Sequence, residues 1–289
     1  MSFTDEKIKV LNGLLSRYSF SDGFTFYWFA NEVSDKGVSS RHSVILSGHD
    51  PRIKNELSGA GNFALFPIVF DYFDAILDKK MSINNKKFFE KKSIFINFNR
   101  DDEVIDFLEK NVLSNAVELR NKIIHNDLTV NEENGLISLP NGEKYKIANF
   151  DILNRLVFNV ASRCLNNKNY SMYEKSAALS LYKTVFGESQ SDVISSLYKK
   201  AGLVEMEICA RIYSDYTKKT ISSTDPLFEI LSENVEYKSK ETGETEFKKG
   251  VYGNRTFKFI LNDSNVIIPA ELIISNKNIT LNDIGDWGI

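Results

Sequence analysis

The chain has 289 residues, of which 42% are hydrophobic and 26% charged, and its formal net charge at pH 7 is −3. This balance is typical of a globular protein with a substantial core, and it excludes a disordered chain and a uniformly basic nucleic-acid-binding protein. Cys164 and Cys209 form neither a zinc nor a disulfide pattern, so we expect a reducing, cytoplasmic location. No uninterrupted apolar run reaches the about 18 residues that a membrane span needs, and the charged N-terminal stretch does not resemble a signal peptide.

The first 60 residues predict an extension of mixed helix and strand. An amphipathic helix is predicted over 5–20, because its apolar side chains share one face. The aromatic stretch 24–36, FTFYWFANEVSDK, is expected to form a buried helix, with a platform that stacks nucleic-acid bases as the alternative. Residues 44–46 predict a short strand. His42 and His49 lack a third strong ligand nearby, so no metal site is predicted.

A helix and a basic segment precede the centre of the chain. The helix is predicted to begin near Asn62, a good N-cap residue, and to reach about residue 80. The basic segment, 79–100, contains several lysines and Arg100 but a single acidic residue, Glu90. A charge run is usually a solvated face, but the position of this one also favours contact with an RNA backbone. The candidates for that contact are Lys86, Lys87, Lys91 and Lys92.

The central helix is predicted over about 102–126, with acids in its first turn and apolar residues at spacings of three and four. Near its end lies ELRNKIIHND, residues 118–127. Arg120 and His125 are five positions apart, so an α-helix would point them ~140° away from each other. Asn121 and His125, in contrast, share a face. The purely structural interpretation is a histidine that contacts carbonyls at the helix end and an arginine in a salt bridge.

The second half of the chain predicts a β-meander, further helices and a β-rich tail. Asn-Gly pairs at 134–135 and 141–142 are strong hairpin signals, so a meander is expected over about 128–147. Later helices are predicted over 150–165, 173–186 and about 189–220, with a break near Gly202 as the alternative for the last. From Asp225 onward, apolar runs such as VYGNRTFKFILND, NVIIPAELIIS and NITLND, separated by Asn, Gly and Pro, predict strands.

The sequence LRNKIIHND at the end of a helix, in a small helical bundle, resembles the HEPN superfamily. Its ribonucleases carry an arginine and a histidine separated by four to six residues, often with a polar residue directly after the arginine. Here those positions are Arg120, Asn121 and His125, and the resemblance covers roughly residues 60–167. It implies a mainly α fold with a β component: a HEPN-like helical bundle with an inserted β-meander and a small β-rich C-terminal region. The expected domains are 1–60, an N-terminal extension; 61–168, the bundle; 169–222, a helical extension; and 223–289, the β-rich region.

The resemblance implies metal-independent RNA cleavage, without a cofactor, in a toxin or anti-phage defence role. A histidine with a pKa near ~6.5 can act as base or acid at neutral pH. Arginine offers a planar fork to phosphate oxygens. HEPN nucleases work as dimers, and one chain supplies a single motif histidine. We therefore expect a homodimer whose cleft is lined by Arg120, Asn121 and His125 of both copies.

Other residues are expected around this cleft. Glu118 either orients His125 or pairs with Lys122, which is also an RNA-backbone candidate. Asp71 and Asp74 either reach the motif from the preceding helix or form a solvated face. The expected partners are RNA, a second copy and an antitoxin or regulatory protein, with no membrane. The alternative function is a catalytically silent HEPN-like module that binds nucleotides or a partner protein.

Overall fold

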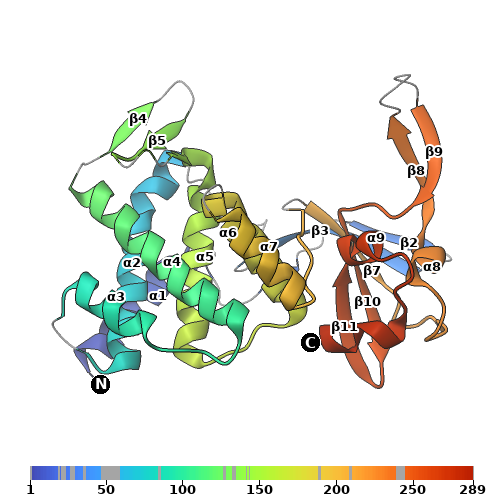
Figure 1. The fold of residues 1–289 in the computed structure, drawn as a ribbon, viewed down its shortest axis with the longest axis horizontal. Helices are drawn as coiled ribbons and strands as arrows, with labels where there is room; N and C mark the ends of the chain where they lie inside the picture. Colours follow the sequence, from blue (N-terminus) through green and yellow to red (C-terminus); the bar gives the residue numbers. More distant parts are fainter. Residues whose placement is uncertain are drawn as a thin grey trace. The chain divides into compact units, whose positions relative to one another are not determined.

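The structure of this chain is a computed structural model (Figure 1). It describes residues 2–18, 20, 24–26, 30–34, 37–46, 59–83, 86–125, 128–131, 135–140, 142, 144–187, 190–207, 210–238 and 245–288. Two compact units divide the chain. The first comprises residues 1–25, 45–169 and 178–197, and the second comprises 26–44, 170–177 and 198–289. Helices and strands together confirm a mainly α fold with a β component.

The first unit is a helical bundle. Its helices are α1 (Phe3–Ser16), α2 (Gly59–Met81), α3 (Phe88–Ile96), α4 (Glu103–Ile124), α5 (Phe150–Asn166) and parts of α6 (Met172–Phe186) and α7 (Ser191–Lys200). α2 is central, because it packs against α1, α3, α4 and α5. Its side chains Phe66, Val69, Phe70, Phe73 and Ile76 are buried. Burial of such large apolar side chains is the main force that holds the bundle together.

α2 has the length and apolar composition that a membrane-spanning helix also has. The stretch Ala60–Met81 has the length and composition to cross a bilayer, yet 61% of its window is buried inside the protein. The charged residues Asp74 and Asp78 lie within this stretch, where Lys91 pairs with both. These features are those of the core helix of a bundle.

α4 confirms the predicted central helix almost residue for residue. Asp102 caps its start, since Oδ1 accepts the backbone N–H groups of Val104 and Ile105, each at 3.0 Å. Its buried apolar side chains recur at spacings of three and four: Val104, Ile105, Leu108, Val112, Leu113, Ala116 and Leu119. His125 is the C-cap residue, and its backbone N–H donates to the carbonyl of Asn121 at 3.0 Å.

The predicted meander follows α4. Strands β4 (Thr129–Asn131), β5 (Leu136–Ser138) and β6 (Lys144–Lys146) form an antiparallel three-stranded sheet. Gly135 and Gly142, the second residues of the two Asn-Gly pairs, have φ of +61° and +88°. Only glycine adopts this backbone region without strain, which explains why the two turns fall at these pairs. A 3₁₀ turn, η1 (Ile147–Asn149), then leads into α5.

A six-stranded sheet lies mainly in the second unit, although residues 24–25 and 45–46 of its strands fall in the first. Its strands are β1 (Phe24–Phe26), β2 (Ala30–Ser34), β3 (Gly37–Leu46), β7 (Ala210–Asp215), β10 (Arg255–Leu261) and β11 (Ser264–Pro269). The order is β1-β3-β7-β10-β11, with β2 on β3, and β7 and β10 are parallel. The remaining elements are α8 (Leu227–Leu231), β8 (Glu233–Lys238), β9 (Thr245–Gly250), α9 (Ala270–Ser275) and η3 (Leu281–Trp287).

Arg211 is the buried charge of this unit, with 1% of its side chain exposed. Its guanidinium donates to both carboxylate oxygens of Glu271, at 2.7 Å and 2.6 Å. Its Nε and Nη2 donate to the Thr256 hydroxyl and the Arg255 carbonyl. Every nitrogen of the fork therefore has a partner, and the arginine ties β7 to β10 and α9.

Four predictions for this part of the chain are wrong in whole or in part. Residues 24–36, expected as a helix, contain β1 and β2. The stretch expected to be helical over 189–220 is helical only to Lys200, close to the break considered near Gly202, and 210–215 pair in the sheet as β7. NVIIPAELIIS is a strand only to Pro269, after which Ala270–Ser275 form α9. NITLND forms no strand, because Leu281–Trp287 is a 3₁₀ helix. The β-rich region therefore extends beyond residues 223–289, because its sheet also contains strands from 24–46 and 210–215.

Candidate active site at the end of α4

Arg120 lies on the side of α4 that meets α2 and α3. Its Cζ is 4.5 Å from the centroid of the Phe88 ring and 5.9 Å from that of Phe70. The two rings meet edge to face, with centroids 5.1 Å apart. A guanidinium on an aromatic face is attracted by the partial negative charge of that face. The edge of the guanidinium then remains able to donate hydrogen bonds.

The hydrogen bonds of Arg120 are few. Nη1 donates to Oδ1 of Asn121 at 3.4 Å, which is long for such a bond. Nε is buried and has no partner among the described residues. A buried donor without a partner costs about 1–3 kcal/mol. Ring contacts, rather than hydrogen bonds, therefore hold this guanidinium in place.

His125 faces solvent. It is exposed at the C-terminal end of α4, beside Ile124, whose side chain is 48% exposed. No hydrogen bond or ring contact joins His125 to Arg120 within the part of the chain that the structure describes. Within the described residues, a single copy therefore shows no contact between the two side chains, and their divergence stays a prediction from helix geometry. The side chain of Asn121 accepts the long hydrogen bond from Arg120, and its backbone carbonyl accepts the ordinary helical hydrogen bond of the His125 N–H.

The four lysines proposed to contact RNA divide into one buried lysine and three accessible ones. Lys91 is 4% exposed, and its Nζ lies 2.7 Å from both Asp74 and Asp78. It is therefore not available to an RNA backbone, which corrects the expectation for this lysine. Asp74 serves the same cluster rather than the motif. Lys86 and Lys87 are exposed and Lys92 is half-buried, and none of the three forms an ion pair with a described residue.

Burial and charge oppose each other in the Lys91 cluster. Burial alone would lower the pKa of the Lys91 ammonium, but the two carboxylates outweigh it and raise that pKa above its ordinary value. Burial raises the pKa of Asp74, against the effect of its hydrogen bond from Lys91. One ammonium is therefore shared by two carboxyl groups.

Phe88 is a residue of this region that the sequence reasoning missed. Its ring contacts two cations, with the Lys91 Nζ 5.6 Å and the Arg120 Cζ 4.5 Å from its centroid. It therefore links the buried cluster to the motif arginine. One sequence signal indicates a buried cation beside this region. Asp74 and Asp78 lie four residues apart in an apolar helix, and buried carboxylates require a cation nearby.

The other candidates lie apart from this contact. Glu118 is exposed, Lys122 is half-buried in the last turn of α4, and Asp71 is half-buried in α2. His42 falls in β3, but its side chain, like all of His49, lies outside the described residues, as do the side chains of the proposed stacking platform. Within the described part, no group of three His, Cys, Asp or Glu side chains is placed to hold a metal ion.

No protein-family model matches this chain, and no match to it was found among curated proteins or solved structures. The candidate site therefore rests on the residues and geometry of the chain itself.

Proposed function

We propose that this protein is a metal-independent endoribonuclease whose site combines Arg120, Asn121 and His125 from two copies in a homodimer. The observation that carries the proposal is the arrangement at the end of α4. His125 is fully available to a ligand, while Arg120 is fixed by rings at the border of the bundle. Since the two side chains diverge within one chain, a phosphodiester would meet both only where a second copy completes the site.

The chemistry follows from the residue types. His125 of one copy accepts the proton of the RNA 2′-hydroxyl, and the 2′-oxygen forms a bond to phosphorus. The bond from phosphorus to the 5′-oxygen breaks, and His125 of the second copy gives its proton to that oxygen. The products are a 2′,3′-cyclic phosphate and a 5′-hydroxyl. Arg120 donates from its edge to the charged phosphate oxygens of the transition state, and Asn121 keeps that edge in position.

The surroundings suit an anionic substrate. Lys86, Lys87 and Lys92 precede α4 in the chain and are not neutralised by described acids. Contacts of lysine with an RNA backbone release counterions, so binding should weaken as salt rises. A cytoplasmic toxin or anti-phage defence role, with an antitoxin or regulatory partner, belongs to the same proposal.

A second candidate function is a catalytically silent module that binds nucleotides or a partner protein. The observation that favours it is the packing of Arg120, whose Nε is buried and whose guanidinium lies on the Phe88 ring. In this role Arg120 fastens α4 to α2 and α3, and the exposed end of α4 serves only for contact.

Purified wild-type protein and His125→Ala, incubated with RNA in a chelator, separate the two functions. The nuclease predicts fragments with cyclic phosphate ends from the wild type and a loss of about 10²–10⁴-fold in the variant. The same substitution at His42 is the matched control, and thermal melting confirms that both variants fold. If the wild type binds RNA without cleaving it, and His125→Ala behaves identically, the silent module is supported and the nuclease is excluded.

A further inference from the structure

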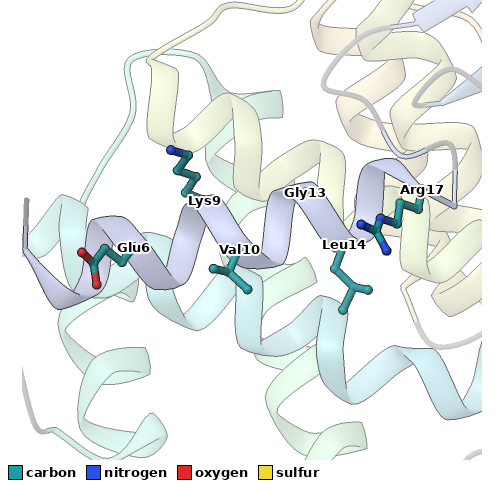
Figure 2. A pocket seen from close by; sticks show the side chains of 6 residues that line it. All are labelled: Glu6, Lys9, Val10, Gly13, Leu14 and Arg17. Carbon is teal, nitrogen blue, oxygen red and sulfur yellow. The ribbon is translucent and has the colours of Figure 1, made fainter.

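α1 carries two faces, and one of them is open. Ile8 and Leu15 are buried, on the face that packs against α2. On another side, six residues line a hollow of about 670 Å³, and Figure 2 shows them along the helix, with Glu6 near one end and Arg17 near the other. These residues are Glu6, Lys9, Val10, Gly13, Leu14 and Arg17.

The open face has the spacing of a helix-pairing seam. Glu6, Val10, Gly13 and Arg17 follow one another at intervals of four, three and four residues, which keeps them on one line of the helix. Val10 is 68% exposed. A Cβ added at Gly13 would meet nothing within 4 Å, so no described residue covers this glycine. A glycine within a helix costs stability, but it permits the close approach of another helix.

The charges on this face are unused within the chain. Asp5, on a neighbouring side of α1, pairs with Lys79 at 2.9 Å. Glu6 and Arg17, in contrast, form no ion pair with any residue that the structure describes. They have opposite signs and stand eleven residues apart, roughly 16 Å along the helix axis. The open face therefore carries Glu6 with the basic Lys9 one turn away near one end, Arg17 near the other end, and the small Gly13 between them.

We propose that a second copy of this chain docks along α1 in the antiparallel direction. Glu6 of each copy then lies opposite Arg17 of the other, and Val10 of each fills the space above Gly13 of the other. A two-fold axis makes every contact occur twice, so the face is complementary to itself. Lys9 then lies opposite Leu14, where its aliphatic stem covers the apolar side chain. This self-complementarity identifies a second copy, rather than another protein, as the occupant.

The contact should be weak on its own. α1 has 14 residues, and a helix of that length spans only about 21 Å. Such a pair buries less than the about 1,200 Å² that stable protein interfaces reach, so we expect dissociation on dilution. The contact involves α1 alone, and it stands whether or not the chain cleaves RNA.

Sedimentation velocity over a wide range of protein concentration tests this inference, using the full chain. The wild type should self-associate through α1 as its concentration rises, and Glu6→Arg or Arg17→Glu alone should weaken this association at least roughly tenfold by placing like charges opposite each other, which leaves at most the dimer proposed at the end of α4. Mixing these two variants should restore association, because each charge on one then meets its opposite on the other. The double variant Glu6→Arg/Arg17→Glu should also dimerise.

Two further variants complete the design. Gly13→Leu should block the close approach while favouring the helix itself, so that loss of the dimer cannot be ascribed to unfolding. Asn12→Glu changes the charge of α1 away from the seam and should leave the dimer unchanged. A monomer at every concentration would overturn the inference. So would a dimer that ignores the Glu6 and Arg17 reversals, since this result would place the interface elsewhere, including at the end of α4.

Discussion

Lys91→Met should destabilise the first unit strongly, although the change removes only one charge. Lys91 lies between two carboxylates, and its side chain is 5% exposed, against 9% for Asp74 and 18% for Asp78. Removal of one partner of a buried ion pair typically costs about 3–5 kcal/mol, because the remaining charge is left without compensation. Since Asp78 retains some contact with water, we expect a cost near the lower end, about 3 kcal/mol.

Urea unfolding followed by circular dichroism measures this cost. Lys92→Met is the matched control on the same helix, because Lys92 is half-buried and unpaired among the described residues, and it should change stability by less than about 0.5 kcal/mol. Asp74→Asn in the Lys91→Met background should recover about 1 kcal/mol or more, as it removes one uncompensated charge. A Lys91→Met cost no larger than that of Lys92→Met would refute the assignment of Lys91 to a buried cluster.

The pH dependence gives this prediction a sign. The folded-state pKa of Lys91 is raised above its ordinary 10.5, so its contribution to stability is fully present below pH 10.5. It should be lost as pH rises through the folded-state pKa. The cost of Lys91→Met should be smaller at pH 4 than at pH 7, because burial raises the pKa of Asp74 and acid therefore removes its uncompensated charge more readily. Equal costs at both values would show that packing, rather than charge, causes the loss.

Three other predictions concern separate parts of the molecule. Burial raises the pKa of the Cys164 thiol from 9.0 to about 11. The contribution of this thiol to stability is therefore full below pH 9.0 and declines by roughly 2–3 kcal/mol as pH rises through 11. Urea titrations at several pH values should show this decline in the wild type and not in Cys164→Ala. Arg211→Met should cost about 3–5 kcal/mol in thermal or urea unfolding, since it strands Glu271, and a loss below about 1 kcal/mol would contradict the buried pair. Phe88→Leu should lower kcat for RNA cleavage roughly tenfold by loosening Arg120, with KM little changed, as steady-state kinetics would measure; an unchanged kcat would show that the ring does not position the arginine.

Local signals were sufficient for several elements. α4 could be predicted because Asp102 is a strong N-cap and the apolar spacing of three and four continues for the whole helix. The meander could be predicted because two Asn-Gly pairs fix the turns, and Gly135 and Gly142 have the positive φ that such turns need. In both cases the residues that decide the structure lie within a few positions of one another.

The strands of the large sheet could not be predicted so directly. A short, continuously apolar run such as that around Phe24 fits a buried helix and a buried strand equally well, and periodicity alone does not separate them. β7 becomes a strand through its parallel pairing with β10, in which Arg255 lies opposite Ile212, more than forty positions earlier. NITLND was misassigned because Thr280 and Asp283 form a capping box, which starts a helical turn after an apolar residue.

The candidate site likewise combines features that local sequence predicts with features that depend on distant residues. The divergence of Arg120 and His125 is a prediction from helix geometry, whereas the contact of Arg120 with the Phe88 ring came only from the structure. The role of Lys91 does not follow from its neighbours in sequence, the exposed Glu90 and the half-buried Lys92. It depends on Asp74 and Asp78 of another helix, whose separation by four residues places both carboxylates beside the ammonium. A charge run therefore cannot be read as one surface before the packing of its helix is known.

The central claim is that Arg120 and His125 of two copies form one RNA-cleaving site. Its most direct test is to add increasing amounts of His125→Ala to a fixed amount of wild-type protein and to measure RNA cleavage in a chelator. If each site needs both histidines, mixed dimers are inactive, and cleavage should fall steeply as the variant comes into excess. Cleavage that is unchanged by added His125→Ala, or that is equally strong in the variant alone, would contradict the claim.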